Sequence, residues 1–188
     1  PTTINRKNFI KFMAKCISYQ DYKNIVEWVI IDGTKDLKSD LELTIKEIEN
    51  FKNLPNINFL KQDLNRNNNI GSLRNILIDN SIGDIMIFFD DDDFYFENRI
   101  SHSVNMLINS KCDLALCSDM FLYETDFKLI YKFKSYGQYH GLCCTMAFTK
   151  NYIKNNRFDN NKSSAEETSF TNGFTNKAIQ LDPRSTII

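Results

Sequence analysis

Apolar residues along this chain recur at two different spacings, and the spacing predicts which segments are helices and which are strands. Near the start, Phe9, Phe12, Met13, Cys16 and Ile17 repeat every three to four positions, which predicts a helix over residues 7–18. Short continuous apolar runs bounded by polar or turn residues predict buried strands instead. By these criteria, the first 117 residues hold further helices over about 41–51, 70–77 and 100–108, and strands over 27–31, 57–60, 85–89 and 114–117.

Strands that alternate with helices in this way predict βαβ units and a mostly parallel, Rossmann-like central sheet flanked by helices, in an α/β fold. The pattern loosens after residue 119. There it predicts strands over 120–123, 129–133 and 142–148, and a helix over 166–174. The polar, Asn-rich segment 155–164 is expected to be a mobile loop.

Length and charge limit the function classes. The 188 residues fit a single domain, and 42% hydrophobic residues are enough to build a core. The 23 basic and 24 acidic residues nearly cancel, so a broadly basic face for nucleic acid is not expected.

The five cysteines form no C-x-x-C pair, which argues against a zinc site and against a secreted disulfide framework. We expect reduced, mostly buried thiols in a cytoplasmic protein. No apolar stretch approaches the roughly 20 residues that span a bilayer. Because the sequence opens on Pro1 and stops within the apolar run 186–188, we expect a fragment of a longer protein, in which an anchor could lie elsewhere.

Polar residues follow the predicted strands at their carboxyl ends, where an open parallel sheet binds its ligands. These polar segments are residues 1–6, 32–36, 61–63 and 90–93. Polar loops occur in every α/β domain, so no single segment is specific. Together they could contact the base, the ribose and the phosphates of a nucleotide.

The run Asp90-Asp91-Asp92-Asp93 is the most specific of these segments. Adjacent carboxylates repel one another unless a positive charge lies among them, and a divalent cation supplies that charge. Mg²⁺ and Mn²⁺ prefer oxygen ligands, commonly one or two carboxylates together with substrate phosphates. The alternative is a solvated acidic turn.

Arg74 lies in the segment Gly71-Ser72-Leu73-Arg74-Asn75 at a predicted helix start. Its guanidinium could reach a diphosphate or pair with a neighbouring carboxylate. The sequence has neither a G-x-G-x-x-G fingerprint nor a P-loop, so it does not match those two modes of nucleotide binding.

In this order, these motifs resemble those of the inverting glycosyltransferase family 2, whose enzymes have the GT-A fold. Residues 1–6, PTTINR, are similar to the family's P-T-Y-N-R opening with one extra residue, and VIIDGTKD at 29–36 is similar to its V-D-D-G-S-x-D segment. Residues 71–75 match its G-x-x-x-A-R-N region loosely. FFDDDD at 88–93 closely resembles its F-L-D-x-D-D motif, and SAEETSF at 164–170 resembles its later E-D segment, with Glu in place of Asp.

The resemblance implies that residues 1–93 bind a nucleoside-diphosphate sugar, most often UDP-linked, and that residues 94–188 bind an acceptor through a smaller mixed sheet. It implies transfer of the sugar to an acceptor hydroxyl with inversion, and a Mn²⁺ or Mg²⁺ cofactor. The family's first strand would lie centrally in the sheet, and here we expect it to be absent or reduced to residues 1–3. The partners are then the donor and a glycan, protein or small-molecule acceptor, with no nucleic acid and no membrane segment in this chain.

The resemblance also implies roles for individual residues. Asp92 is the expected direct metal ligand, and Asp90 is expected on the metal or the ribose. Glu167 is the expected general base, with Glu166 bonding backbone or acceptor hydroxyls; the alternative is that both only cap a helix. The remaining expected donor-binding residues are Thr2, Thr3, Arg6, Asp32, Gln62, Arg74 and Asp91. Asp93 and His140 are assigned to the acceptor side, although a lone histidine is more often structural, and His102 is expected on the surface.

Three other functions share part of this pattern. A nucleotidyltransferase would carry a Gly-rich phosphate loop near its N-terminus, and a phosphatase would carry its D-x-D near the start, followed by Gly-Thr. Neither feature is found. The third alternative is a module of the same fold that binds a sugar nucleotide or glycan without turnover.

Overall fold

The computed structural model describes residues 2–3, 6–34, 41–61, 63 and 65–187. Its elements alternate between strands and helices through the first two thirds of the chain, as the apolar pattern predicts. In chain order they are β1 (Thr2–Thr3), α1 (Lys7–Ser18), β2 (Glu27–Asp32), α2 (Leu41–Ile48), β3 (Asn56–Leu60), α3 (Ile70–Asp79), β4 (Ile85–Ile87), α4 (Arg99–Ser110), β5 (Leu114–Leu116), β6 (Met120–Glu124), β7 (Leu129–Phe133), β8 (Ala147–Thr149), α5 (Glu167–Phe170) and β9 (Ile179–Gln180), with 3₁₀ turns at Cys143–Thr145, Tyr152–Lys154 and Pro183–Ser185.

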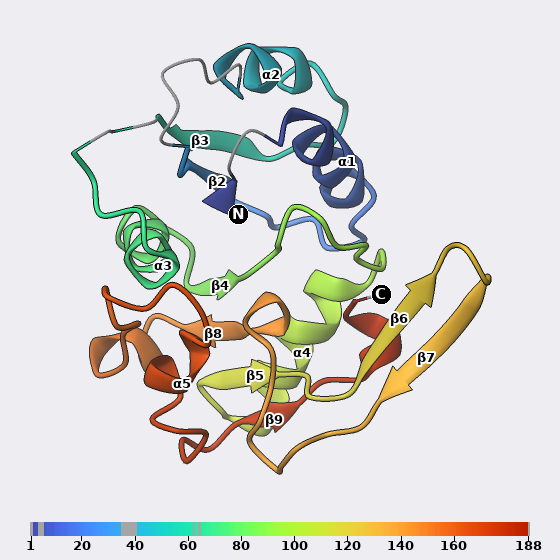
Figure 1. Ribbon diagram of the computed structural model, residues 1–188, viewed down its shortest axis with the longest axis vertical. Coiled ribbons are helices and arrows are strands. Elements are labelled where there is room, and N and C mark those ends of the chain that lie inside the picture. Colours follow the sequence, from blue (N-terminus) through green and yellow to red (C-terminus); the bar gives the residue numbers. More distant parts are fainter. Residues whose placement is uncertain (1, 4–5, 35–40, 62, 64, 188) are drawn as a thin grey trace.

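The described strands form three separate sheets, whereas a mostly parallel central sheet with a smaller mixed sheet was expected. One is parallel, in the order β1-β2-β3. The second has the order β4-β8-β5-β9, and β8 runs antiparallel to both β4 and β5. The third is the hairpin β6-β7, which extends away from the rest of the molecule in Figure 1. The fold is therefore α/β, with its parallel pairing concentrated in the N-terminal half.

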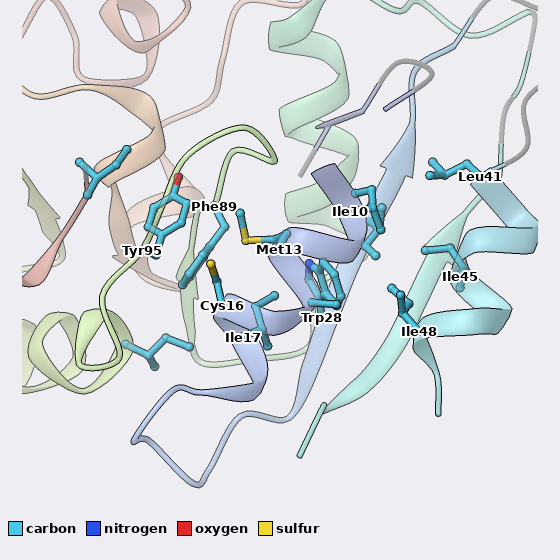
Figure 2. Packing of buried hydrophobic residues seen from close by; sticks show 14 of the residues in the cluster. Ile10, Met13, Cys16, Ile17, Trp28, Leu41, Ile45, Ile48, Phe89 and Tyr95 are labelled. Atoms are coloured by element: carbon cyan, nitrogen blue, oxygen red, sulfur yellow. The ribbon is translucent and has the colours of Figure 1, made fainter. Parts of the chain in front are cut away.

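Helices cover both faces of β2, and its side chains alternate between them. Ile30 packs in a core cluster with apolar residues of α1 and α2, while Ile31 packs against Leu73 and Leu77 of α3 on the other face. Figure 2 shows part of the larger cluster, in which Trp28 of β2 lies beside α1. A strand covered on both faces has to be apolar throughout, which explains the continuous run at residues 28–31.

Two predicted elements differ from the structure. Residues 142–148 were expected to be one strand, but Cys143–Thr145 form a 3₁₀ turn and only Ala147–Thr149 pair as β8. The Thr145 hydroxyl stabilises this turn, because it donates to a backbone carbonyl and accepts from the Cys117 amide at 2.9 Å. The helix expected over 166–174 ends at Phe170, because Asn172, Gly173 and Phe174 all have positive φ angles.

The Asn-rich segment 155–164 is a loop, as predicted, but it is anchored to the core. Phe158 is buried and stacks on Phe170, with ring centroids 4.2 Å apart. Asn75 of α3 donates to the Phe158 carbonyl at 2.8 Å. The prediction of a mobile loop overlooked this one aromatic residue.

The cysteine prediction is confirmed: all five thiols are free, and all but Cys144 are buried. Across the described residues, no helix has the length and apolar character needed to cross a bilayer.

Candidate active site

The four aspartates form a turn directly after β4 and Phe88-Phe89, and a tyrosine fixes this turn to the core. The Asp90 amide donates to the Tyr95 hydroxyl oxygen at 2.7 Å, and that hydroxyl lies 3.4 Å from a carboxylate oxygen of Asp93. The Tyr95 ring is buried against Phe89, with centroids 4.4 Å apart, and both side chains are labelled in Figure 2. The acidic turn is thus held by packing as well as by hydrogen bonds.

Two of the aspartates converge on a third group that could bind a cation. A carboxylate oxygen of Asp90, one of Asp93 and Sγ of Cys144 all lie within 4.8 Å of one another, which makes a possible metal site among the described residues. Burial raises the pKa of the Cys144 thiol well above its ordinary value, so the thiol stays protonated and is a weak ligand. Burial, with the charges of Asp90 and Asp92, also raises the pKa of Asp93 to about 7. The two carboxylates are therefore the main potential ligands.

Arg6 pairs with the other two aspartates. Its Nη1 lies 3.0 Å from Asp91 Oδ1 and 2.9 Å from Asp92 Oδ2. Burial opposes the charged form of Arg6, but the hydrogen bond and charge of Asp91, with those of Asp92, outweigh it and raise its pKa. Asp91 is only 2% exposed, and its Oδ2 is buried with no hydrogen-bond partner among the described residues. Asp92, the residue expected to bind the metal directly, has a half-exposed side chain.

Arg74 joins the acidic turn to the segment that carries the two glutamates. Its Nε donates to Glu166 Oε1 at 2.8 Å, and its Nη1 and Nη2 each lie 3.3 Å from Asp90 Oδ1. Burial opposes the charged form, but the neighbouring Cys143, Asp90 and Glu166 raise the pKa of Arg74. The sequence left open whether Arg74 reaches a diphosphate or pairs with a carboxylate, and the structure shows the pairing.

The two candidate bases differ in their surroundings. Glu166 is 5% exposed and its side chain accepts a hydrogen bond from Arg74, and no backbone amide among the described residues donates to it. The expected contact with acceptor hydroxyls stays a prediction. Glu167 begins α5 and is half-buried, and its carboxylate has no ion pair or hydrogen bond among the described residues. The Glu166 carboxylate is thus paired with Arg74, whereas the Glu167 carboxylate is open to a ligand.

The expected nucleoside-binding residues lie at the carboxyl end of the parallel sheet. Thr2 and Thr3 form β1 and pair with Ile31 and Asp32. Asp32 is buried, and its Oδ1 accepts the Thr34 amide at 2.9 Å. Gln62 lies outside the described residues. The sequence therefore placed β1 and the end of β2 at one edge correctly, while contacts with a nucleoside stay a prediction.

The two histidines are held in different ways. Nδ1 of His140 lies 2.6 Å from the Ser118 hydroxyl, and its ring lies between Tyr136 and Phe174. Nε2 of His102 accepts the Asp182 amide at 3.0 Å, so His102 is a half-buried structural contact and not the surface residue expected.

Sequence reasoning missed three residues that shape the site: Tyr95, Arg99 and Cys144. Arg99 is fully buried and donates to the Thr145 carbonyl at 2.6 Å. A tyrosine two positions after the aspartates was the one available signal. Nothing in the sequence distinguishes Cys144 from a core cysteine, or Arg99 from a surface arginine.

Several solved structures have the same fold as this chain. The S. aureus TarS structure aligns with a TM-score of 0.74 at 17% identity, over 99% of this chain and 35% of TarS. A structure of TarS 1-349 in complex with UDP-GlcNAc aligns with a TM-score of 0.72 at 18% identity, over 99% of this chain and 56% of that one. The mannosyltransferase PcManGT from Pyrobaculum calidifontis, in complex with GDP-Man and Mn²⁺, aligns with a TM-score of 0.74 at 15% identity, over 99% and 54%.

The chain thus spans about a third to somewhat more than half of the structures that it resembles. No curated protein sequence matches it. The family comparison is direct, however: residues 2–171 match the family described as Glycosyl transferase family 2, and this range contains β1, the acidic turn, Arg74 and both glutamates. The chain belongs to Glycosyl transferase family 2.

Proposed function

We propose that this chain is the catalytic domain of a metal-dependent, inverting glycosyltransferase. It moves a sugar from a nucleoside-diphosphate donor, UDP-linked, to an acceptor hydroxyl. Residues 1–93 bind the donor and residues 94–188 bind the acceptor. The convergence of the Asp90 and Asp93 carboxylates at the end of β4 is the observation that carries this proposal. Structures of similar fold contain UDP-GlcNAc in one case and GDP-Man with Mn²⁺ in another, which supports the donor class.

The residues at the acidic turn suit Mn²⁺ or Mg²⁺. Hard divalent cations take oxygen ligands, and Asp90 and Asp93 supply them within 4.8 Å. Asp91 Oδ2, which is buried without a hydrogen-bond partner among the described residues, is one more carboxylate oxygen in the acidic turn. Asp90 and Asp93 would hold the cation, with Asp92 as a third ligand once it leaves Arg6. When bound, the cation neutralises the charge that develops on the departing diphosphate.

The chain's own side chains supply the remaining chemistry. Glu167, whose carboxylate is open, accepts the proton of the acceptor hydroxyl as that oxygen attacks the sugar. Glu166 and Arg74 hold the segment before α5 against the acidic turn, which fixes the distance between base and donor. Arg6 is the exposed cation nearest the aspartates, so it is positioned to meet the phosphates. Thr3 and Asp32, adjacent in the β1-β2 ladder, bind the nucleoside.

Calorimetry tests the donor and metal assignments together. UDP should bind far more tightly with Mn²⁺ than without it, and by linkage Mn²⁺ should bind more tightly with UDP by the same factor. Asp93→Asn should remove this coupling, while the matched control Asp126→Asn, an exposed acid on the β6-β7 hairpin, should keep it. Unchanged coupling in Asp93→Asn contradicts the metal assignment.

Turnover is tested separately, with a panel of UDP- and GDP-linked sugars and Mn²⁺. Slow release of free sugar from one donor identifies both the activity and the sugar. Donor binding without any release, in the presence of acceptor glycans as well, would instead support the non-catalytic binding module.

A further inference from the structure

The β6-β7 hairpin and its flanking residues form an arm, residues 119–136, that displays apolar side chains to solvent. All five residues of β7 are exposed, and Figure 1 shows this strand on the outer side of the arm, away from the rest of the molecule. The exposed aromatic residues of the arm are Tyr123, Phe127, Tyr131, Phe133 and Tyr136. Soluble monomers rarely expose a large contiguous apolar patch, so the arm has the character of an interaction surface.

The base of the arm is fixed, but its outer edge is open. Asp119 accepts the Ser135 amide at 2.8 Å and pairs with Lys132 at 2.8 Å. Beyond this base, β6 and β7 pair only with each other among the described strands. A two-stranded hairpin is marginally stable in water on its own, and a third strand or a packed surface is needed to stabilise it. The outer edge of β7 is the place where a further strand can add.

A second copy of β7 fits this edge. Two antiparallel copies related by a two-fold axis at Tyr131 pair all five residues of the strand. Leu129 then lies opposite Phe133 of the second copy, Ile130 lies opposite Lys132, and the two Tyr131 residues lie opposite each other. Aromatic pairs directly opposite one another stabilise a sheet. The edge is therefore complementary to itself, as a two-fold interface requires.

The same register covers the two most exposed aromatic side chains of the arm. Residue 127 lies opposite residue 135 of the second copy, which brings Phe127, 75% exposed, next to Tyr136, 83% exposed. At about 200 Å² for each fully exposed ring, the five aromatic residues display roughly 600 Å² per copy, which approaches the about 800 Å² per partner of a standard interface.

The charges of the arm also permit two copies to meet. Its three acidic residues are balanced by three lysines, so the two arms do not repel each other; these residues are Asp119, Glu124, Asp126, Lys128, Lys132 and Lys134. We infer that the arm joins two copies of this chain into a two-fold dimer, with a continuous four-stranded sheet in the order β6-β7-β7-β6. This inference is independent of the proposed transfer reaction.

A cysteine at the two-fold axis tests the register. Residues directly opposite in an antiparallel pair have Cα atoms about 4.5–5.5 Å apart, within the roughly 4.4–6.8 Å that a disulfide spans. Tyr131→Cys should therefore cross-link the dimer when oxidised glutathione is added. In the control Phe127→Cys, the two cysteines lie about eight positions apart, or about 27 Å, and should not cross-link, although Phe127 is the more exposed residue. The parent chain, whose cysteines are free, gives the background.

A matched pair of charge variants tests the contact itself. Sedimentation at about 1–100 μM should show the parent chain in a monomer–dimer equilibrium. Ile130→Lys sets a lysine opposite Lys132 of the second copy, twice by symmetry, and should weaken dimerisation by about tenfold or more. Ile82 is 68% exposed and lies in the loop before β4, so Ile82→Lys should leave dimerisation unchanged.

The outcomes separate the dimer from its register. A parent chain that stays monomeric over this range overturns the inference, and so does a dimer that Ile130→Lys leaves intact. Equal cross-linking of Tyr131→Cys and Phe127→Cys overturns the register, and with it the pairing of β7 with its copy.

Discussion

Glu166 and Glu167 are adjacent, yet they lie in different surroundings, and we expect substitution of each by glutamine to separate stability from turnover. Glu166→Gln keeps an acceptor for Arg74 Nε but removes the charge that balances a buried guanidinium. A hydrogen bond to a charged group contributes about 1.5–3 kcal/mol, and breaking a buried pair outright costs about 3–5 kcal/mol. Because Asp90 still pairs with Arg74 at 3.3 Å, we expect a loss of about 2–3 kcal/mol. For a chain of this size that lowers the melting temperature by roughly 5–10 °C.

Glu167→Gln should behave in the opposite way. Its carboxylate has no partner among the described residues, so the free energy of unfolding should change by less than about 0.5 kcal/mol. Turnover should fall by about 10²- to 10⁴-fold, the usual cost of losing a general base, with donor affinity nearly unchanged. Urea denaturation gives the first quantity, and donor turnover with an acceptor gives the second. If Glu166→Gln is stable and inactive while Glu167→Gln is active, the two roles must be exchanged.

Three further predictions concern the support of the site. Arg99 is buried without a carboxylate partner in the described chain, and burial lowers its pKa to about 10. Because Arg99→Met leaves no buried charge, the free energy of unfolding measured in urea should fall more for Arg99→Lys than for Arg99→Met. The reverse order contradicts this reasoning. Burial lowers the pKa of His102, whose neutral ring accepts a hydrogen bond from the Asp182 amide. The contribution of His102 to the free energy of unfolding is therefore present above about pH 6.5 and is lost as the pH falls below that value. His102→Gln should therefore lose less stability than the parent between pH 7.5 and 5.5, and an equal loss would exclude His102 as the source. Phe158→Ala should cost about 3–5 kcal/mol of unfolding free energy, since it removes a ring stacked on Phe170, and a cost below about 1 kcal/mol would show that the loop is not anchored there.

Local patterns predicted local elements well. The helix at Lys7–Ser18 and the strand at Leu129–Phe133 have the predicted bounds, because each depends on its own apolar spacing or run. The turn at Cys143–Thr145 was missed because a hydroxyl bonded to the distant Cys117 amide stabilises it. The helix after Glu166 was predicted too long because left-handed backbone at three consecutive residues is not visible in hydrophobic spacing.

Sheet organisation was predicted less well, for a related reason. Alternating strands and helices indicate parallel pairing only between strands that end up as neighbours. β8 lies between β4 and β5 and is antiparallel to both, and it comes from a part of the chain where the alternation has stopped. The order of strands depends on contacts between segments far apart in sequence, and no local periodicity records them.

The same limit applied to the charges of the site. The sequence located every acidic residue near the end of β4, but not the partner of each. Arg6 pairs with Asp91 and Asp92, which lie 85 or more positions away in the sequence, and Arg74 pairs with Glu166, which lies 92 positions away. Of the five carboxylates, those of residues 90–93 and Glu166, four therefore pair with two guanidinium groups, and Asp93 has no arginine partner among the described residues. Fully ionised, the five carboxylates leave three uncompensated negative charges, with Asp93 among the groups that burial penalises. If the chain binds a nucleoside diphosphate as proposed, this negative charge repels the diphosphate, and we expect a cation to enter with it. We then expect Arg6, the more exposed of the two arginines, to turn from the aspartates to the phosphates.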